Sequence, residues 1–195
     1  SLERAVPYGP WIEILGSLTT QLLAKNSDDL ELLRREILRR IKGRGRLLGK
    51  LAPDLKLVIG PTAELPDKPT RLALQKELRA VVEFLQVFSR PGRPLALFFD
   101  DMQWADDATQ HLLDELLEQA PGNLLLIFAR RSDAAPDSKP CVPPVSIRST
   151  TLDLRPLTVG AVMEMIGERY HAAPEAALQL AELVHAKTAG NPFFI

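Results

Sequence analysis

Apolar residues recur at spacings of three and four through the first half of the chain, a period that predicts amphipathic helices. Helices are expected at about residues 11–22, 28–42 and 70–88. The stretch 47–59 fits either a short helix or a strand, and 60–69 is a proline-rich connector. The expected buried positions are Trp11, Ile14, Leu15, Leu18 and Leu22; Leu30, Leu33, Ile37 and Ile41; and Leu74, Leu78, Val81, Leu85 and Phe88.

Past Pro94 the pattern changes to two continuous apolar runs, Leu95–Phe99 and Leu124–Ala129, which flank an amphipathic segment. Runs without polar alternation predict strands that are buried on both faces of a parallel sheet. The segment between them has one apolar face, formed by Ala108, Leu112, Leu116 and Ala120. Strand, helix and strand in this order predict a βαβ unit with a right-handed crossover.

The last part of the chain predicts a loop at 134–144, a short strand at Thr151–Leu154 and two helices at 159–170 and 174–188. A proline at the start of the second helix and Gly190 after its end suit those positions. The expected fold class is α/β, because helices and apolar strands alternate along the chain.

Composition narrows the functional classes. The 24 basic and 25 acidic residues give a net charge of -1, so no overall attraction to nucleic acid or to an acidic membrane is expected. A single cysteine, Cys141, and the lack of a long apolar run favour a cytoplasmic protein without a membrane segment. The chain starts at Ser1 and stops just after the aromatic pair Phe193-Phe194, and we interpret both ends as cuts.

The clearest chemical feature is the acidic pair Asp100-Asp101, directly after the first apolar run. Open α/β sheets bind ligands at the carboxyl ends of their strands. Mg²⁺ needs only one or two protein carboxylates beside its waters and the nucleotide phosphates. Asp100 is therefore a candidate to hold hydrated Mg²⁺, and Asp101 a candidate to orient or deprotonate an attacking water. The alternative is that the two acids only end a strand in solvent.

The acidic pair opens the segment Asp100–Asp106, Asp-Asp-Met-Gln-Trp-Ala-Asp, which closely resembles the extended Walker B segment of STAND-class AAA+ ATPases. These are large signalling ATPases of bacterial regulators and kinase hybrids. Three further segments are similar to elements of this family: Pro7-Tyr8, Pro53–Pro61, and Lys187–Phe194, in which Ala189 replaces a glycine. The similarity covers essentially the whole chain in the family's order, and the ordered set is more specific than any one element.

The resemblance implies a role for each polar strand end. Asp100 takes the Mg²⁺ position, Asp101 takes the catalytic carboxylate position, and ATP is the nucleotide. The second apolar run becomes the sensor strand, and Arg131 matches the family arginine that contacts the γ-phosphate. Arg130 replaces a tyrosine and Ser132 replaces an acid, so either arginine is a candidate for the nucleotide. Alternatively, the two arginines only end a strand in water.

Gly190-Asn191-Pro192 resembles the Gly-x-Pro element that follows the NTPase core, which implies that Pro192 lies near adenine or ribose. The same residues suit the end of one helix and the start of the next, and the two interpretations are compatible. The implied architecture is a P-loop NTPase-type parallel sheet flanked by helices, with 1–157 as the core and 158–195 as the start of an α-helical lid.

A phosphate-binding Gly-x-x-x-x-Gly-Lys-Ser/Thr loop occurs nowhere in the chain. In the family this loop precedes the element that Pro7-Tyr8 resembles, so we expect it upstream of Ser1. By itself the chain is expected to bind ATP weakly or not at all. The family also implies partners: other domains of the parent chain, such as a kinase or regulator output, and nucleotide-dependent self-association.

Two other functions stay open. One is a non-catalytic, ATPase-like scaffold for protein–protein interaction in a signalling protein. The other is DNA binding through a basic cluster, although a solvated helix face is the favoured interpretation because no aromatic residues interleave it. The cluster consists of Arg34, Arg35, Arg39, Arg40, Lys42, Arg44 and Arg46. The three histidines and Cys141 have no metal-ligand spacing.

Overall fold

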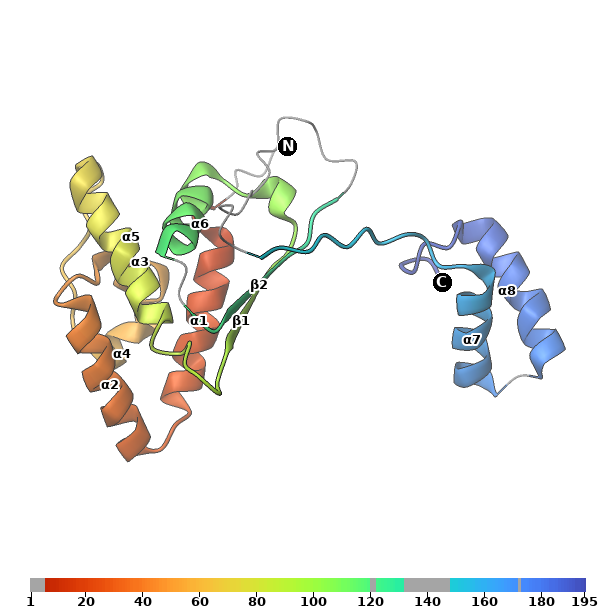
Figure 1. Cartoon of the computed structure of the whole chain (residues 1–195), viewed down its shortest axis with the longest axis horizontal. Coiled ribbons are helices and arrows are strands. Elements are labelled where there is room, and N and C mark those ends of the chain that lie inside the picture. Colours follow the sequence, from red (N-terminus) through yellow and green to blue (C-terminus); the bar gives the residue numbers. More distant parts are fainter. Residues whose placement is uncertain (1–5, 120–121, 132–147, 172) are drawn as a thin grey trace. The chain divides into compact units, whose positions relative to one another are not determined.

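The described residues of the computed structural model are 6–119, 122–131, 148–171 and 173–195. They belong to two compact units, Ser1–Arg148 and Ser149–Ile195 (Figure 1). The predicted assignment of 1–157 to a catalytic core and 158–195 to a lid stays a prediction, because compactness alone does not define either. Among the described residues, no helix combines the length and the apolar character needed to cross a membrane.

Helices make up the first part of unit 1. They are α1 (Gly9–Leu23), α2 (Ser27–Ile41), α3 (Arg46–Leu51), the 3-10 turn η1 (Pro53–Leu55), α4 (Lys56–Ile59) and α5 (Arg71–Leu85). The three predicted amphipathic helices are confirmed, and the ambiguous stretch 47–59 is helical. Local hydrogen bonds define two of the starts: Asn26 Oδ1 accepts the Asp29 N–H at 2.8 Å, and the Thr70 hydroxyl accepts the Ala73 N–H at 3.3 Å.

The predicted βαβ unit is present. Strand β1 (Leu95–Phe99) pairs in parallel with β2 (Leu124–Phe128), and the 3-10 turn η2 (Met102–Trp104) and helix α6 (Asp107–Gln119) connect them. The register runs from Leu95 opposite Leu124 to Phe99 opposite Phe128. The two strands form a two-stranded sheet in the described part of the chain. The molecule is therefore a mixed α/β protein.

The prediction that these strands are buried on both faces is wrong for the described residues. Leu97 and Phe99 are buried, whereas Phe98 is 57% exposed, Leu125 55% and Ile127 44%. The face that carries Phe99 packs on α1, and no described element covers the opposite face to the same degree. Burial on both faces needs helices on both sides of a sheet, and a run of apolar letters cannot guarantee them.

The core of unit 1 is centred on Trp11 of α1, which is fully buried as predicted. Its ring meets Phe99 edge-on at a centroid distance of 5.0 Å, and its indole N–H donates to the Thr109 carbonyl of α6 at 3.2 Å. Phe99 in turn stacks on Phe128 at 5.3 Å. Trp11 of α1 thus contacts both the sheet and the helix that connects its strands. The ribbon of Figure 1 shows α1 beside these elements.

Unit 2 consists of α7 (Val159–Tyr170) and α8 (Pro174–Thr188), which coincide with the predicted helices. Their small core contains Val162, Ile166, Ala177 and Ala181. The predicted strand Thr151–Leu154 is wrong: the segment has no strand structure, and Leu152 and Leu154 are 80% and 91% exposed. An apolar segment becomes a strand only where another strand pairs with its backbone, and none does so among the described residues.

Candidate functional site

The carboxyl ends of β1 and β2 bring together four of the predicted site residues. Asp100 and Asp101 follow β1, and Arg130 and Arg131 follow β2. Because the strands are parallel, with their last residues paired, both ends lie at the same edge of the sheet. The Ala129 N–H donates to the Phe99 carbonyl at 2.8 Å, which extends this pairing past the strands. The chain therefore brings two acidic residues and two arginines to one edge of the sheet.

Local backbone geometry orients the two acids. Asp101 has φ 50° and ψ 39°, in the left-handed region, and its N–H donates to Asp100 Oδ1 at 2.8 Å. Both acids are exposed. The left-handed conformation costs a non-glycine residue about 1 kcal/mol, so the contacts of the following turn must stabilise it. One of these contacts is the Met102 N–H, which donates to the Ala129 carbonyl at 3.0 Å.

Gln103 makes a bridge across this edge that the sequence did not predict. Its Nε2 group donates to Asp101 Oδ1 at 2.7 Å. Its Oε1 atom accepts the backbone N–H of Arg131 at 3.1 Å. The one signal for Gln103 in the sequence is its place in the segment that resembles an extended Walker B element, and that position carries no information about these partners.

Asp106 joins the acidic segment to the start of the chain. Its Oδ1 accepts the Thr109 N–H at 3.0 Å, which caps the start of α6. The same carboxylate accepts the backbone N–H of Tyr8 at 3.3 and 3.4 Å, 98 residues away in sequence. Burial, and then the negative charge of Asp106, raise the pKa of the Tyr8 phenol. Trp104, which ends the 3-10 turn η2, is 70% exposed.

The donor set at the edge fits Mg²⁺ better than a closed metal site. Among the described residues, no group of three or more His, Cys, Asp or Glu side chains gathers around a common point. A hydrated Mg²⁺ needs only one or two protein carboxylates, and Asp100 and Asp101 are exposed at the carboxyl end of β1. The residues present are therefore chemically suitable for Mg²⁺ beside a phosphate.

The predicted residue Pro192 lies in unit 2, in the turn after α8, and is exposed. The glycine of the same element has a structural reason: Gly190 has φ 74°, and a methyl group there would collide with the carbonyl oxygen of Leu157. The Leu157 N–H donates to the Gly190 carbonyl at 2.8 Å. Packing alone thus explains the glycine, and the nucleotide role of Pro192 stays a prediction.

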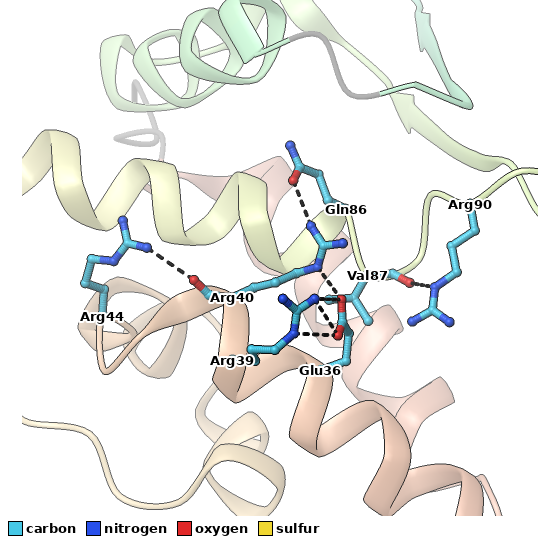
Figure 2. A network of polar contacts seen from close by, with 7 residues as sticks. All are labelled: Glu36, Arg39, Arg40, Arg44, Gln86, Val87 and Arg90. Carbon is cyan, nitrogen blue, oxygen red and sulfur yellow. Dashed lines mark hydrogen bonds and ion pairs between the residues drawn. The ribbon is translucent and has the colours of Figure 1, made fainter.

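Arg39, Arg40 and Arg44 of the basic cluster contact side chains and a carbonyl group of their own chain (Figure 2). Glu36 accepts from Arg39 at 2.9 Å and from Arg40 at 2.6 Å. Arg40 also donates to the Gln86 side chain at 3.1 Å, and Arg44 pairs with Glu83 of α5 at 2.6 Å. The positive charge of the cluster is therefore partly compensated within unit 1.

Several predictions fall outside the described residues. They concern Ala120 on the face of α6, the replacement of the family acid by Ser132, the loop at 134–144 and the environment of Cys141.

Paired parallel strands joined by a helix, with acids and arginines at their carboxyl ends, define a mixed α/β domain with a polar edge. The family model described as AAA ATPase domain matches residues 1–127 of the 195. The chain belongs to the AAA ATPase domain family. This result agrees with the resemblance noted above at the level of the AAA ATPases.

One curated relative adds a biological context. Over 112 residues, the chain is 30% identical to the hybrid signal transduction histidine kinase G of Dictyostelium discoideum. The match covers 57% of this chain but 3% of the relative, so the chain spans a small part of that protein's length. No solved structure matches the chain significantly.

Proposed function

We propose that this chain forms the Mg²⁺-binding and water-activating side of an ATP site in a STAND-class signalling ATPase of the cytoplasm. Membership of the AAA ATPase domain family supports ATP as the ligand. The similarity to a protein named as a hybrid signal transduction histidine kinase supports a role in signalling. In this proposal β1 and β2 belong to a P-loop NTPase-type sheet, and residues 158–195 begin an α-helical lid.

The acids divide the chemical work between them. Asp100 holds hydrated Mg²⁺, directly or through water, with one of its oxygens already fixed by the Asp101 N–H. When bound, Mg²⁺ neutralises charge on the phosphate oxygens. Asp101 orients the attacking water or accepts its proton, a task that needs a correctly placed carboxylate and no covalent step.

The arginines serve the opposite side of the same site. A guanidinium group binds two phosphate oxygens with parallel hydrogen bonds, which suits Arg131 or Arg130 at the end of β2. Arg131 is the favoured sensor, since Gln103 holds its backbone at the acidic turn. In unit 2, Pro192 is proposed to contact the adenine or ribose.

The observation that carries this proposal is the pairing of Phe99 with Phe128. It puts the residues after both strands at one edge, which supports a site where the acids hold the metal and the arginines bind phosphate. Neither pair alone would distinguish a nucleotide site from a solvated strand end.

The test uses the full-length protein that contains this chain, with ATP binding and phosphate release measured separately. Asp101→Asn should lower turnover about 100-fold or more and leave MgATP affinity nearly unchanged, because general-base positioning contributes 10²–10⁴ in rate. Asp100→Ala should also weaken Mg²⁺-dependent binding. Glu118→Gln, an exposed acid of α6, is the matched control and should change neither. Normal turnover by Asp101→Asn would refute the assigned role.

The absence of a phosphate-binding loop from these 195 residues keeps the non-catalytic scaffold as a second candidate. The same experiment separates the two functions. A scaffold would show no MgATP binding in the full-length protein, and Asp100→Ala would leave its assembly with the signalling partner unchanged. A nucleotide switch would instead change its self-association when ATP is added.

A further inference from the structure

Three connections tie the end of β1 and the acidic turn after it to the end of β2, and two of them are backbone hydrogen bonds that many side chains would permit. These are the Ala129 N–H to Phe99 and the Met102 N–H to Ala129. The third runs through a side chain, from Asp101 through Gln103 to the Arg131 N–H. This third connection joins Asp101, which is proposed to orient water, to Arg131, which is proposed to contact phosphate.

The chemistry of the two partners determines which side chain can form this connection. A backbone N–H can only donate, and an ionised carboxylate can only accept. The residue between them must therefore offer an acceptor to Arg131 and a donor to Asp101, which a primary amide does with its two ends. A glutamate of the same shape has no proton to donate and would face Asp101 with a second negative charge. The amide orientation follows from the partners and involves no arbitrary choice.

We infer that Gln103 is a positioning residue that couples the orientation of the Asp101 carboxylate to the backbone at Arg131. The inference rests on the proposed ATPase function and adds a residue to it. With Oδ1 of Asp101 held by Gln103 at 2.7 Å, Oδ2 is the oxygen that orients water. When Arg131 moves in response to phosphate, the Gln103 side chain transmits this movement to the Asp101 carboxylate.

The first experiment needs no nucleotide. Amide exchange of Arg131 is measured by NMR in the 195-residue chain and in three variants. Gln103→Leu should accelerate the exchange of this amide about fivefold, the effect of losing one ordinary hydrogen bond. Asp101→Leu should accelerate it about twofold, since Gln103 then loses its second anchor. In the double variant, Asp101→Leu should add nothing further. That non-additivity is the signature of a bridge.

Gln110→Leu is the matched control. Gln110 donates to the Asp114 carboxylate at 3.0 Å, a hydrogen bond within α6. Its replacement should leave the exchange of the Arg131 amide unchanged. An Arg131 amide that exchanges at the same rate with Gln or Leu at 103 would overturn the inference, as would additive effects of the two changes.

The second experiment measures ATP turnover in the full-length protein. Gln103→Leu should lower kcat about tenfold with little change in KM for ATP, because positioning of the base matters mainly in the transition state. Gln103→Glu should lower it further. If the amide-exchange experiment shows the bridge but kcat is unchanged in both variants, the positioning role of Gln103 is refuted and the ATPase function stands. A lack of turnover in the unmodified protein refutes the proposed function itself, which distinguishes the two failures.

Discussion

The link between Asp106 and Tyr8 offers a stability test that does not depend on any ligand. Replacing Asp106 by alanine removes the acceptor that caps α6 at Thr109 and the acceptor of the Tyr8 N–H. Loss of an N-cap costs about 1 kcal/mol. The partly buried Tyr8 N–H adds about 0.5–1.5 kcal/mol, at the lower end because the two distances are 3.3 and 3.4 Å. The expected loss in the free energy of unfolding is about 1.5 kcal/mol in total.

Tryptophan fluorescence during urea unfolding measures this loss. Both tryptophans lie in unit 1, and Trp11 is fully buried against Phe99, so the emission follows the unfolding of this unit. With a typical slope of about 2 kcal/mol per molar urea, the midpoint should fall by about 0.75 M at constant slope. A change in slope would instead indicate an altered unfolded state.

Asp106→Asn is the matched variant, because asparagine keeps a side-chain oxygen and caps helices as well as aspartate does. It should recover more than half of the loss. A midpoint that stays within about 0.2 M of the original in Asp106→Ala would refute the role of this residue in joining the start of the chain to α6. An asparagine variant as unstable as the alanine variant would show that the charge, and not the acceptor geometry, stabilises the link.

Three further predictions concern other parts of the chain. Ala189→Gly should stabilise unit 2 by about 0.5–1 kcal/mol, because Ala189 has φ 51°, which glycine adopts more readily. Gly190→Ala should destabilise unit 2 by more than about 2 kcal/mol, because the added methyl group would collide with the Leu157 carbonyl oxygen. Urea unfolding followed by the NMR signals of α7 and α8 measures both changes. Because the pKa of Tyr8 is raised above its ordinary 10.0, its stabilising contribution is complete below that pH and is lost as the pH rises through the folded-state pKa. Tyr8→Phe should remove this alkaline loss in a pH series of unfolding curves. The hydrogen bonds from Arg40 and then Arg39 lower the pKa of Glu36 below its ordinary 4.5. The contribution of Glu36 to the free energy of unfolding is therefore present above that pH and is lost as the pH falls through the folded-state pKa. Glu36→Gln should reduce the loss of stability at acid pH in the same series of unfolding curves.

Much of the secondary structure followed from local signals. The helices of both units were predicted because their apolar faces repeat at helical spacing, and side-chain caps at Asn26 and Thr70 reinforce two of the starts. The βαβ unit was predicted because two apolar runs flank an amphipathic segment. Apolar spacing and helix caps depend only on residues that are close in sequence, so the sequence alone is enough to predict these elements.

The failures concern positions whose environment is set by distant parts of the chain. Phe98 and Ile127 were expected to be buried and are exposed, because a second helical layer is needed to cover that face of the sheet. Thr151–Leu154 was expected to be a strand and is not, because a strand needs a partner. Local sequence describes what a segment can do, and the rest of the molecule decides whether it does so.

For the candidate site, the sequence by itself determined which residues end each strand: two acids after the first and two arginines after the second. Only the tertiary structure decided that these ends meet at one edge, that Gln103 spans them and that Asp106 reaches Tyr8 across 98 residues. The physical reason is that these contacts depend on the register of the parallel pair and on the left-handed turn at Asp101. Both are properties of packed backbone, and no short pattern of residues specifies them.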